Sequence, residues 1–290
     1  MTVTTDLASF WAAWPLFEDA VLTGTLAGIA LGIIGVFIVL GRMVFVSAAL
    51  SQTASLGVTL AFYLQTLGVS ATIASPSLGA MVISLAALTL IWRNTEQARA
   101  RRDSMLGIIF LVGSAGTIML ASRVVQELHD VQTLLFGSSV AVLPEDFRTV
   151  LVLAIGIVVL YVWWWRGFVE VTYDEATARV RGMPVRLLKL VLMITVALGV
   201  SICTRVLGAL PAFAFGVFPA MAAIAIAPNI PRAMAFAALA GGASGFGGYL
   251  LAYLYDFPVG ASQVMMGACI WLAVSLSARV VSGVRGGANG

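Results

Sequence analysis

The stretch SAALSQTASLGVTLAFYL, residues 47–64, is apolar overall and carries no charge, yet small polar side chains recur along it. It is long enough to cross a bilayer as a helix. Residues three or four apart lie on one side of a helix, and the residues at that spacing are Ala48, Ser51, Gln52, Ser55 and Thr59. Their polar groups either line a path for a cation or a small polar solute, or bond to neighbouring helices in the membrane.

Side chains suited to covalent or acid–base catalysis are scarce. The single histidine, His129, cannot by itself form a site with several histidine ligands, and its position outside the apolar runs excludes an intramembrane Ser/His pair. No GxSxG sequence occurs, and the single lysine, Lys189, lies in LLKLV, which excludes a GxxxxGK(S/T) phosphate-binding loop. An intramembrane enzyme is therefore the least favoured class. Energy for any work must come from another chain or from a gradient.

A gradient-driven carrier or a channel is the rival class. Proton- and sodium-coupled carriers usually hold a carboxylate or a cation inside the membrane, whereas the acidic residues here fall in connecting segments or near predicted helix ends. A soft-metal site is a further alternative, because Met265, Met266 and Cys269 have helical spacing. Methionine more commonly fills space in a core, and both cysteines, Cys203 and Cys269, are expected to be packing residues.

The composition predicts a membrane protein. Of 290 residues, 61% are hydrophobic and 10% are charged, whereas a soluble domain has roughly 25% charged residues. Apolar runs cover the whole length, so we expect an all-α polytopic protein with one transmembrane domain, residues 1–290. Runs of about 20 mostly apolar residues predict about nine helices: 18–40, 44–66, 74–92, 104–122, 148–165, 187–205, 207–227, 233–254 and 259–278. Pro211 and Pro219 interrupt the seventh.

The basic residues predict how these helices cross the membrane. With 93–103, 166–189, Arg42, Arg232 and the C-terminal tail in the cytoplasm, thirteen of the sixteen Lys and Arg residues lie inside. The positive-inside rule favours this arrangement over its mirror image. We expect a multi-pass protein of the bacterial inner membrane, with its N-terminus outside and its C-terminus in the cytoplasm. The positive net charge then reflects these loops, and nucleic acid is not an expected partner.

Close helix packing is predicted for the first span, where Gly24, Gly28 and Gly32 recur every four residues. Such a ladder of small residues lets another helix approach closely. The eighth span contains a looser glycine cluster, GGASGFGG, residues 241–248, which suits the same purpose.

The connecting segment 167–186 contains residues that are typical of helix starts and helix ends. Asp174 and Glu175 stand where a short helix would begin, and carboxylates are favourable at that end of a helix. Gly182 can end this helix and Pro184 can open the next one. The pattern predicts two short helices that project into the cytoplasm and form a docking surface.

These residues also carry a family resemblance. YDEATARVRGMPVRLLKLVLM resembles the D/E-x-x-x-A-x-x-x-G-x-P cytoplasmic element of ABC importer permeases of the cobalamin and siderophore architecture. More closely, the chain is similar to the permeases of zinc and manganese ABC importers, the ABC-3 family. GIIGVFIVLGRMVFVSAALSQTASLG corresponds to the second-helix signature of that family. LLFGSSVAVLPEDF, GALPAFAFGVFPAMAAIAI and YDFPVGASQVMMGACIWL follow in the family's order, so the resemblance covers most of the length.

The resemblance implies a type II ABC importer permease that moves a divalent transition metal, of the zinc or manganese class, inward with ATP hydrolysed by a partner. The implied partners are a cytosolic ATPase dimer, an extracytoplasmic solute-binding protein, a second permease copy, with a homodimer expected, and membrane lipid. ATP and Mg would be bound by the ATPase, leaving no cofactor on this chain. The implied coupling residues are Asp174, Glu175, Ala178, Arg181, Gly182, Met183 and Pro184.

Outer charges suit the docking of a binding protein, because rim charges mostly set encounter rate and register. The candidates are Glu18, Asp19, Arg123, Arg148 and Arg205. The segment 123–147 mixes charged and apolar residues and is predicted to lie on the outer membrane surface or to re-enter it.

One departure from the family pattern affects the cargo. The zinc and manganese permeases usually carry an Asp and, four residues later, a His in the second helix, and the matching positions here are Ala48 and Gln52. A methyl group is no metal ligand and a neutral amide is a weak one. The chain therefore passes on a weakly held cation, or carries a metal chelate or another small polar solute, or is the half of a heterodimer that does not bind metal. The metal ligands are left open.

Overall fold

The computed structural model of the chain describes residues 7–70, 72–93, 99–124 and 142–287. Throughout these ranges the regular elements are helices, which confirms the all-α prediction. They are α1 (Leu7–Ala12), α2 (Trp14–Leu40), α3 (Val44–Thr66), α4 (Pro76–Arg93), α5 (Arg99–Val124), α7 (Pro144–Tyr173), α8 (Glu175–Val180), α9 (Val185–Leu207), α10 (Ala209–Phe215), α11 (Phe218–Ile226), α12 (Ile230–Tyr255) and α13 (Val259–Gly287).

The described residues contain nine helical segments that are long and apolar enough to cross a membrane, as predicted. The largest difference in length concerns α7, which runs from Pro144 to Tyr173 instead of 148–165. Pro144 occupies the first turn, where proline favours a helix start, and no other proline interrupts the helix. Residues 167–173 of the predicted cytoplasmic segment therefore continue the membrane helix.

The seventh span is broken into two half-helices, α10 and α11, as its prolines predicted. Pro211 and Pro219 each lie in the first turn of a half-helix, where the missing N–H is not needed. Gly208 precedes α10 with φ of 95°, a left-handed conformation that glycine adopts at little cost. The chain can therefore turn sharply from α9 into α10.

The glycine ladder of α2 packs against the glycine cluster of α12. A Cβ atom added to Gly28 would lie 2.2 Å from the carbonyl oxygen of Gly241, and one added to Gly241 would lie 2.0 Å from the oxygen of Gly28. At Gly32 the same addition would approach the oxygen of Ala237 to 2.5 Å. The two backbones touch directly, which confirms that this ladder serves close helix packing.

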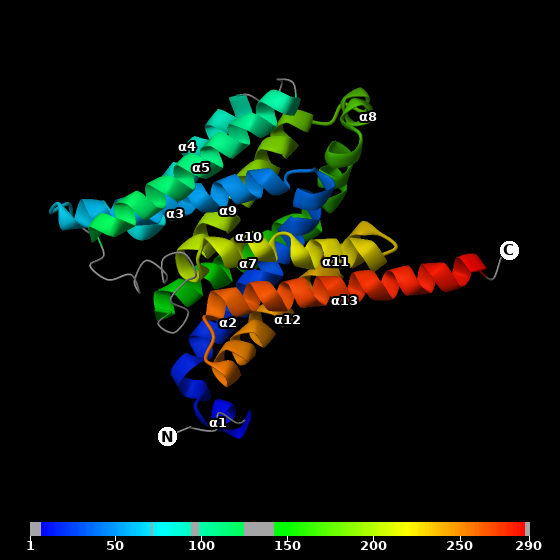
Figure 1. Cartoon of the computed structure of the whole chain (residues 1–290). Helices are drawn as coiled ribbons and strands as arrows, with labels where there is room; N and C mark the ends of the chain where they lie inside the picture. The colour runs from blue at the N-terminus through cyan, green and yellow to red at the C-terminus, as the bar shows by residue number, and fades with distance from the viewer. Residues whose placement is uncertain (1–6, 71, 94–98, 125–141, 288–290) are drawn as a thin grey trace.

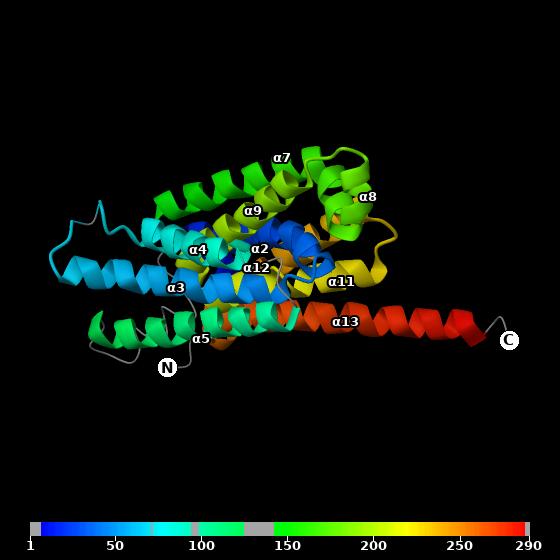
Figure 2. The same ribbon diagram turned by 90° about the horizontal axis from the view of Figure 1, so that it is seen from above.

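The helices form layers around α2 (Figures 1 and 2). Figure 2 shows α7 and α9 on one side of the molecule and α5 and α13 along the opposite side, with α2 and α3 between them. The two views place α8 at one end of the bundle, beyond the cytoplasmic ends predicted for α7 and α9. The core joins buried side chains of α2, α3, α7 and α9 in one cluster.

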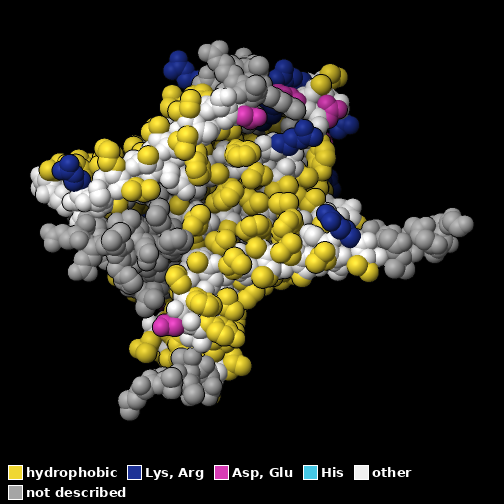
Figure 3. Space-filling view, in the orientation of Figure 1, with side chains coloured by type: hydrophobic (Ala, Val, Ile, Leu, Met, Phe, Trp, Pro, Cys, Tyr) yellow, Lys and Arg dark blue, Asp and Glu magenta, His cyan; other side chains and the backbone are white. Residues whose placement is uncertain are grey.

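The outer surface of the bundle is apolar, as a lipid-facing surface must be. Figure 3 shows hydrophobic side chains covering the face that carries α13, whereas charged side chains gather mainly near the end that carries α8. Large exposed apolar residues on other helices include Leu111, Val162 and Trp163. This distribution agrees with a multi-pass membrane protein.

Candidate functional site

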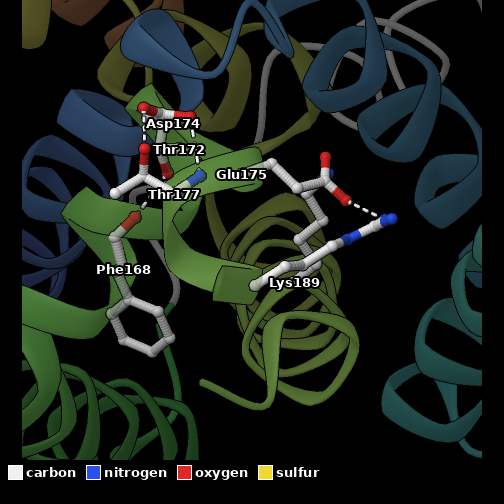
Figure 4. A network of polar contacts seen from close by, with 7 residues as sticks. Phe168, Thr172, Asp174, Glu175, Thr177 and Lys189 are labelled. Carbon is white, nitrogen blue, oxygen red and sulfur yellow. Dashed lines mark hydrogen bonds and ion pairs between the residues drawn. The ribbon is translucent and has the colours of Figure 1, made fainter. Parts of the chain in front are cut away.

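The α8 segment, residues 174–184, is a short helix held between two sharp turns. Asp174 precedes α8, and its carboxylate accepts a hydrogen bond from the backbone N–H of Thr177 at 3.0 Å. The hydroxyl of Thr177 donates a second hydrogen bond to the same carboxylate (Figure 4). These two bonds hold the pKa of Asp174 below its usual value, because they favour its charged form.

The other end of α8 closes as the sequence predicts. Gly182 has φ of 75°, which glycine tolerates and other residues resist, and its N–H donates to the oxygen of Arg179 at 3.0 Å. Pro184 then precedes Val185, the first residue of α9. The prediction of two short helices is wrong in one respect: the second helix is the long span α9 itself.

Ion pairs connect α8 to both neighbouring spans. The carboxylate of Glu175 pairs with Arg179 at 2.6 Å and with Lys189 of α9 (Figure 4), and Glu170 of α7 pairs with Arg181 at 3.5 Å. The hydrogen bond from Lys189 is the largest cause that lowers the pKa of Glu175. The segment is therefore attached to the ends of α7 and α9.

The seven predicted coupling residues lie together in this segment but do not share one face. Ala178 is buried and Met183 is half-buried, so both face the rest of the chain, whereas Arg181, Gly182 and Pro184 are exposed. Val180, which the sequence analysis did not single out, has 89% of its surface exposed at the end of α8.

Two further residues were missed, Arg179 in the segment and Lys189 on α9. Arg179 is exposed beside Val180, and Lys189 supplies the ion pair to Glu175. A lone cation in the apolar run LLKLV needs a partner, and that requirement could have pointed to Lys189. The pattern of local charges would not have shown that Val180 is exposed.

A cavity of about 210 Å³ separates the α8 segment from the turn between α2 and α3. Its lining includes Glu175 and Lys189 on one side and Gly41 and Met43 on the other. The segment therefore has polar attachments to α7 and α9 and open space towards the α2–α3 turn.

The five polar-face residues of α3 are all buried within this single chain: Ala48, Ser51, Gln52, Ser55 and Thr59. The hydroxyl of Ser51 donates to the oxygen of Ala48 at 2.9 Å, and that of Thr59 donates to the oxygens of Ser55 and Leu56 at 3.1 and 3.0 Å. The hydroxyls of Ser51 and Thr59 thus bond to backbone oxygens of their own helix.

Gln52 is the exception on this face. Its side-chain carbonyl oxygen is buried and has no hydrogen-bond partner among the described residues. Helix α5 covers it closely, since a Cβ atom added to Gly113 would lie 2.9 Å from the backbone carbonyl carbon of Gln52. Ser47, on a different face of α3 from Gln52, also has a buried hydroxyl oxygen without a partner among the described residues. Leaving a buried acceptor unpaired costs free energy, so the amide oxygen of Gln52 is the candidate for a transient ligand on this face.

The soft-metal alternative is not supported by the geometry. Met266 packs against α12, where a Cβ atom added to Gly247 would lie 3.2 Å from its methyl carbon, whereas Met265 and Cys269 are exposed. The described ranges also contain no group of three His, Cys, Asp or Glu side chains that could hold a metal ion.

The outer charges differ in their surroundings. Arg205 at the end of α9 pairs with Asp146 in the first turn of α7 at 2.6 Å, with 23% and 14% of the two side chains exposed. Glu18, Arg123 and Arg148 are exposed and Asp19 is half-exposed. Arg205 is thus engaged within the chain, and most of the segment 123–147, with His129, lies outside the described residues.

Fold and site together define a polytopic helical membrane protein with a helical projection at one end. The chain belongs to the ABC 3 transport family, whose model matches residues 13–278. It is therefore a membrane-spanning permease of an ABC transporter and not an enzyme, since ATP hydrolysis resides in a separate subunit. Such permeases work with an ATPase and a substrate-binding protein.

Several relatives match almost end to end. The manganese transport system membrane protein MntC of Halalkalibacterium halodurans is 25% identical over 89% of this chain and 86% of its own length. The high-affinity zinc uptake system membrane protein ZnuB of Haemophilus influenzae is 24% identical over 87% and 94%. A chain of PsaBC from Streptococcus pneumoniae, solved in complex with Fab, superposes with a TM-score of 0.80 and 25% identity over 93% and 95%.

Proposed function

We propose that this permease imports a divalent transition metal of the manganese or zinc class, using ATP hydrolysed by a partner subunit. The observation that carries the proposal is the match to named manganese and zinc permeases over about nine-tenths of this chain. The sequence is consistent with this proposal. Its predicted spans contain neutral oxygen groups that a cation could pass, and it has no nucleotide-binding loop, so ATP must be hydrolysed by a partner.

The proposed orientation places the α8 segment in the cytoplasm, the N-terminus outside and the C-terminus inside. The positive-inside rule supports it, since α8 lies between basic residues of the same end, among them Arg166, Arg186 and Lys189. A cytosolic ATPase would then meet α8, and an extracytoplasmic binding protein would meet the opposite end.

The exposed side of α8 is the proposed contact with the ATPase. Val180 offers an apolar tip and Arg179 and Arg181 flank it. A matching groove on the ATPase would be apolar at its centre and acidic at its rim. ATP and Mg would be bound by that subunit. The ATPase pair would contact two copies of this permease, with a homodimer as the proposed assembly.

The cargo path is proposed to involve the α3 face that holds Ala48, Ser51 and Gln52. Because α5 covers Gln52, the path opens there only when α5 moves relative to α3. An amide oxygen holds a divalent cation weakly, which suits transfer rather than storage. Ala48 and Gln52 stand where the family usually has Asp and His. This difference also favours two alternatives: a chelated metal as cargo, or a partner permease that retains the Asp and His ligands.

The test is uptake into proteoliposomes. The permease is reconstituted with its ATPase and binding protein, and accumulation of manganese and zinc is followed with and without ATP inside a sealed, gradient-free vesicle. We expect accumulation that requires ATP and both partners. Uptake by the permease alone, driven by an imposed ion gradient, would contradict the proposal. Uptake of a metal chelate but not of the bare ions would show that the cargo is the chelate.

A further inference from the structure

Polar contacts join α7 and α9 at three levels along their length. At the outer end Asp146 pairs with Arg205 at 2.6 Å. Near the middle the hydroxyls of Tyr161 and Thr195 lie 2.8 Å apart. At the inner end the two helices are joined through α8, by the pairs Glu175–Lys189 and Glu170–Arg181.

The outer pair, Asp146 and Arg205, lies at helix ends that favour its two charges. Asp146 stands in the first turn of α7 and Arg205 in the last turn of α9, the helix ends that favour a negative and a positive charge respectively. Both side chains are mostly buried, so the pair is screened less by water and salt than an exposed one. Its partners are 59 positions apart in the sequence, so the contact is tertiary.

These contacts make α7, α8 and α9 a unit that spans the membrane. The helix from Asp146 to Tyr173 extends roughly 40 Å at about 1.5 Å per residue. A displacement of α8 at one end is carried to the other end only if the two helices do not slide past each other. Polar contacts at three levels oppose such sliding, and the cavity beside α8 leaves room for movement relative to α2 and α3.

We propose that Asp146 and Arg205 are positioning residues that make the outer end of the α7–α9 hairpin move together with α8. The inference rests on the proposed function, because it assigns the hairpin to signal transfer between the ATPase and the binding-protein side. In this proposal Arg205 acts through Asp146, whereas the sequence analysis considered it as a docking charge.

The test compares variants in the assembled transporter with its ATPase and binding protein. Asp146→Asn and Arg205→Gln remove the pair, Asp146→Arg with Arg205→Asp reverses it, and Glu145→Gln, an exposed neighbour on the same turn, is the matched control. Three quantities are measured: basal ATPase activity, its stimulation by the loaded binding protein, and metal ions transported per ATP.

We expect Asp146→Asn and Arg205→Gln to reduce stimulation and ions per ATP about fivefold or more, with basal ATPase activity close to wild type. Arg205→Lys, which keeps the pair, should retain most of the coupling. The reversed pair, which opposes both helix dipoles, should recover part of it, and a loss of packing alone would allow neither result. Equal coupling in wild type and Asp146→Asn overturns the hairpin inference alone. A wild-type complex without ATP-dependent uptake overturns the proposed function and the inference with it.

A second, independent observation concerns the lipid-facing side. An apolar groove with a volume of about 250 Å³ runs between α7 and α12 over α2, lined by Ile33, Val162, Trp165, Pro231 and Met234 among others. Its residues on α12 belong to the first turns after Ile230. In the proposed orientation the groove therefore lies in the inner leaflet.

Two exposed arginines are sequence neighbours of residues that line this groove. The guanidinium of Arg166 lies 5.5 Å from the ring centroid of the lining Trp165, and Arg232 directly follows the lining Pro231. An apolar channel beneath two cations complements a lipid that has an acyl chain and an anionic headgroup. Basic pockets between helices on the cytoplasmic side bind such headgroups.

We infer that this groove binds an anionic phospholipid of the inner leaflet. The permease is placed in nanodiscs of phosphatidylcholine with one-fifth phosphatidylglycerol, extracted gently, and its retained phosphatidylglycerol is counted by native mass spectrometry. We expect the wild type to retain the lipid, Arg166→Gln with Arg232→Gln to lose it, and Arg186→Gln, an exposed cation on α9, to retain it. Unchanged retention in the double variant, or equal loss in the control, overturns the site.

Discussion

The ammonium group of Lys189, the single lysine of the chain, pairs with the carboxylate of Glu175 at the start of α8. This contact joins a membrane-spanning helix to a segment that projects from the membrane. Both side chains are about one-third exposed, and such pairs contribute only about 0.2–1 kcal/mol to stability. The pair therefore matters more for how α8 moves than for whether the chain folds.

Replacing Lys189 should separate these two effects. In Lys189→Met the carboxylate of Glu175 keeps Arg179 but loses its attachment to α9. We expect a thermal midpoint near that of wild type and a clear fall in metal transported per ATP. Lys189→Arg, which keeps a cation beside Glu175, should retain coupling. A variant that transports as many ions per ATP as wild type would show that this attachment is unnecessary.

Acid should loosen the α8 segment. The pKa of Asp174 and that of Glu175 are both lowered in the folded chain. A carboxylate whose pKa is lowered by folding stabilises the folded chain at pH values above its pKa in the unfolded chain, which is near 4. This stabilisation is lost as the pH falls through the pKa of the folded chain. We expect the amides of α8 to exchange faster with deuterium as pH drops below about 4, after correction for the intrinsic rate.

A matched variant isolates the carboxylate of Asp174 in that experiment. Asp174→Asn keeps a side-chain oxygen that can cap α8 but cannot titrate over this range. Its α8 amides should depend less on pH than those of wild type. An identical pH profile would assign the loosening to another group.

The contact between α2 and α12 should tolerate no added side chain. In Gly28→Ala the new methyl group would lie 2.2 Å from the oxygen of Gly241, so the helices must separate. We expect the free energy of unfolding to fall by about 1–3 kcal/mol or more, seen as a lower thermal midpoint in detergent. Gly156→Ala on α7, which has open space around it, should change it little. Similar midpoints for the two variants would contradict the contact.

The sequence predicted the spans and the close-packing face of α2 because both depend on local patterns. Residues spaced four apart share a helix face, so Gly24, Gly28 and Gly32 had to form one surface. The break between α10 and α11 likewise followed from Pro219, and the turn after α8 from Gly182.

What the sequence could not show depends on which helices become neighbours. Arg205 was assigned to the outer rim, yet it pairs with Asp146 of a different span. The polar face of α3 was predicted to line a path, and its cover, Gly113 of α5, is 61 positions from Gln52. The exposure of Val180 depends on how α8 is tilted by ion pairs to α7 and α9.

Restoring the metal-ligand pair on α3 tests the proposed path. Ala48→Asp with Gln52→His places a carboxylate and an imidazole one turn apart on one face, both good ligands for a divalent transition metal. We expect the double variant to retain manganese or zinc through gel filtration, as measured by elemental analysis, and to turn over more slowly. Neither single variant should do so. A folded double variant with the metal content of wild type would place the path elsewhere.

The central claim is that force from an ATPase reaches this chain through the exposed tip of α8. Val180→Asp, compared with Val162→Ile on the lipid-facing side, tests it most directly by co-purification of the ATPase and ATP-dependent metal uptake. The account predicts that Val180→Asp inserts and assembles in the membrane like wild type but loses the ATPase and the uptake. Full retention of both by Val180→Asp would contradict the account.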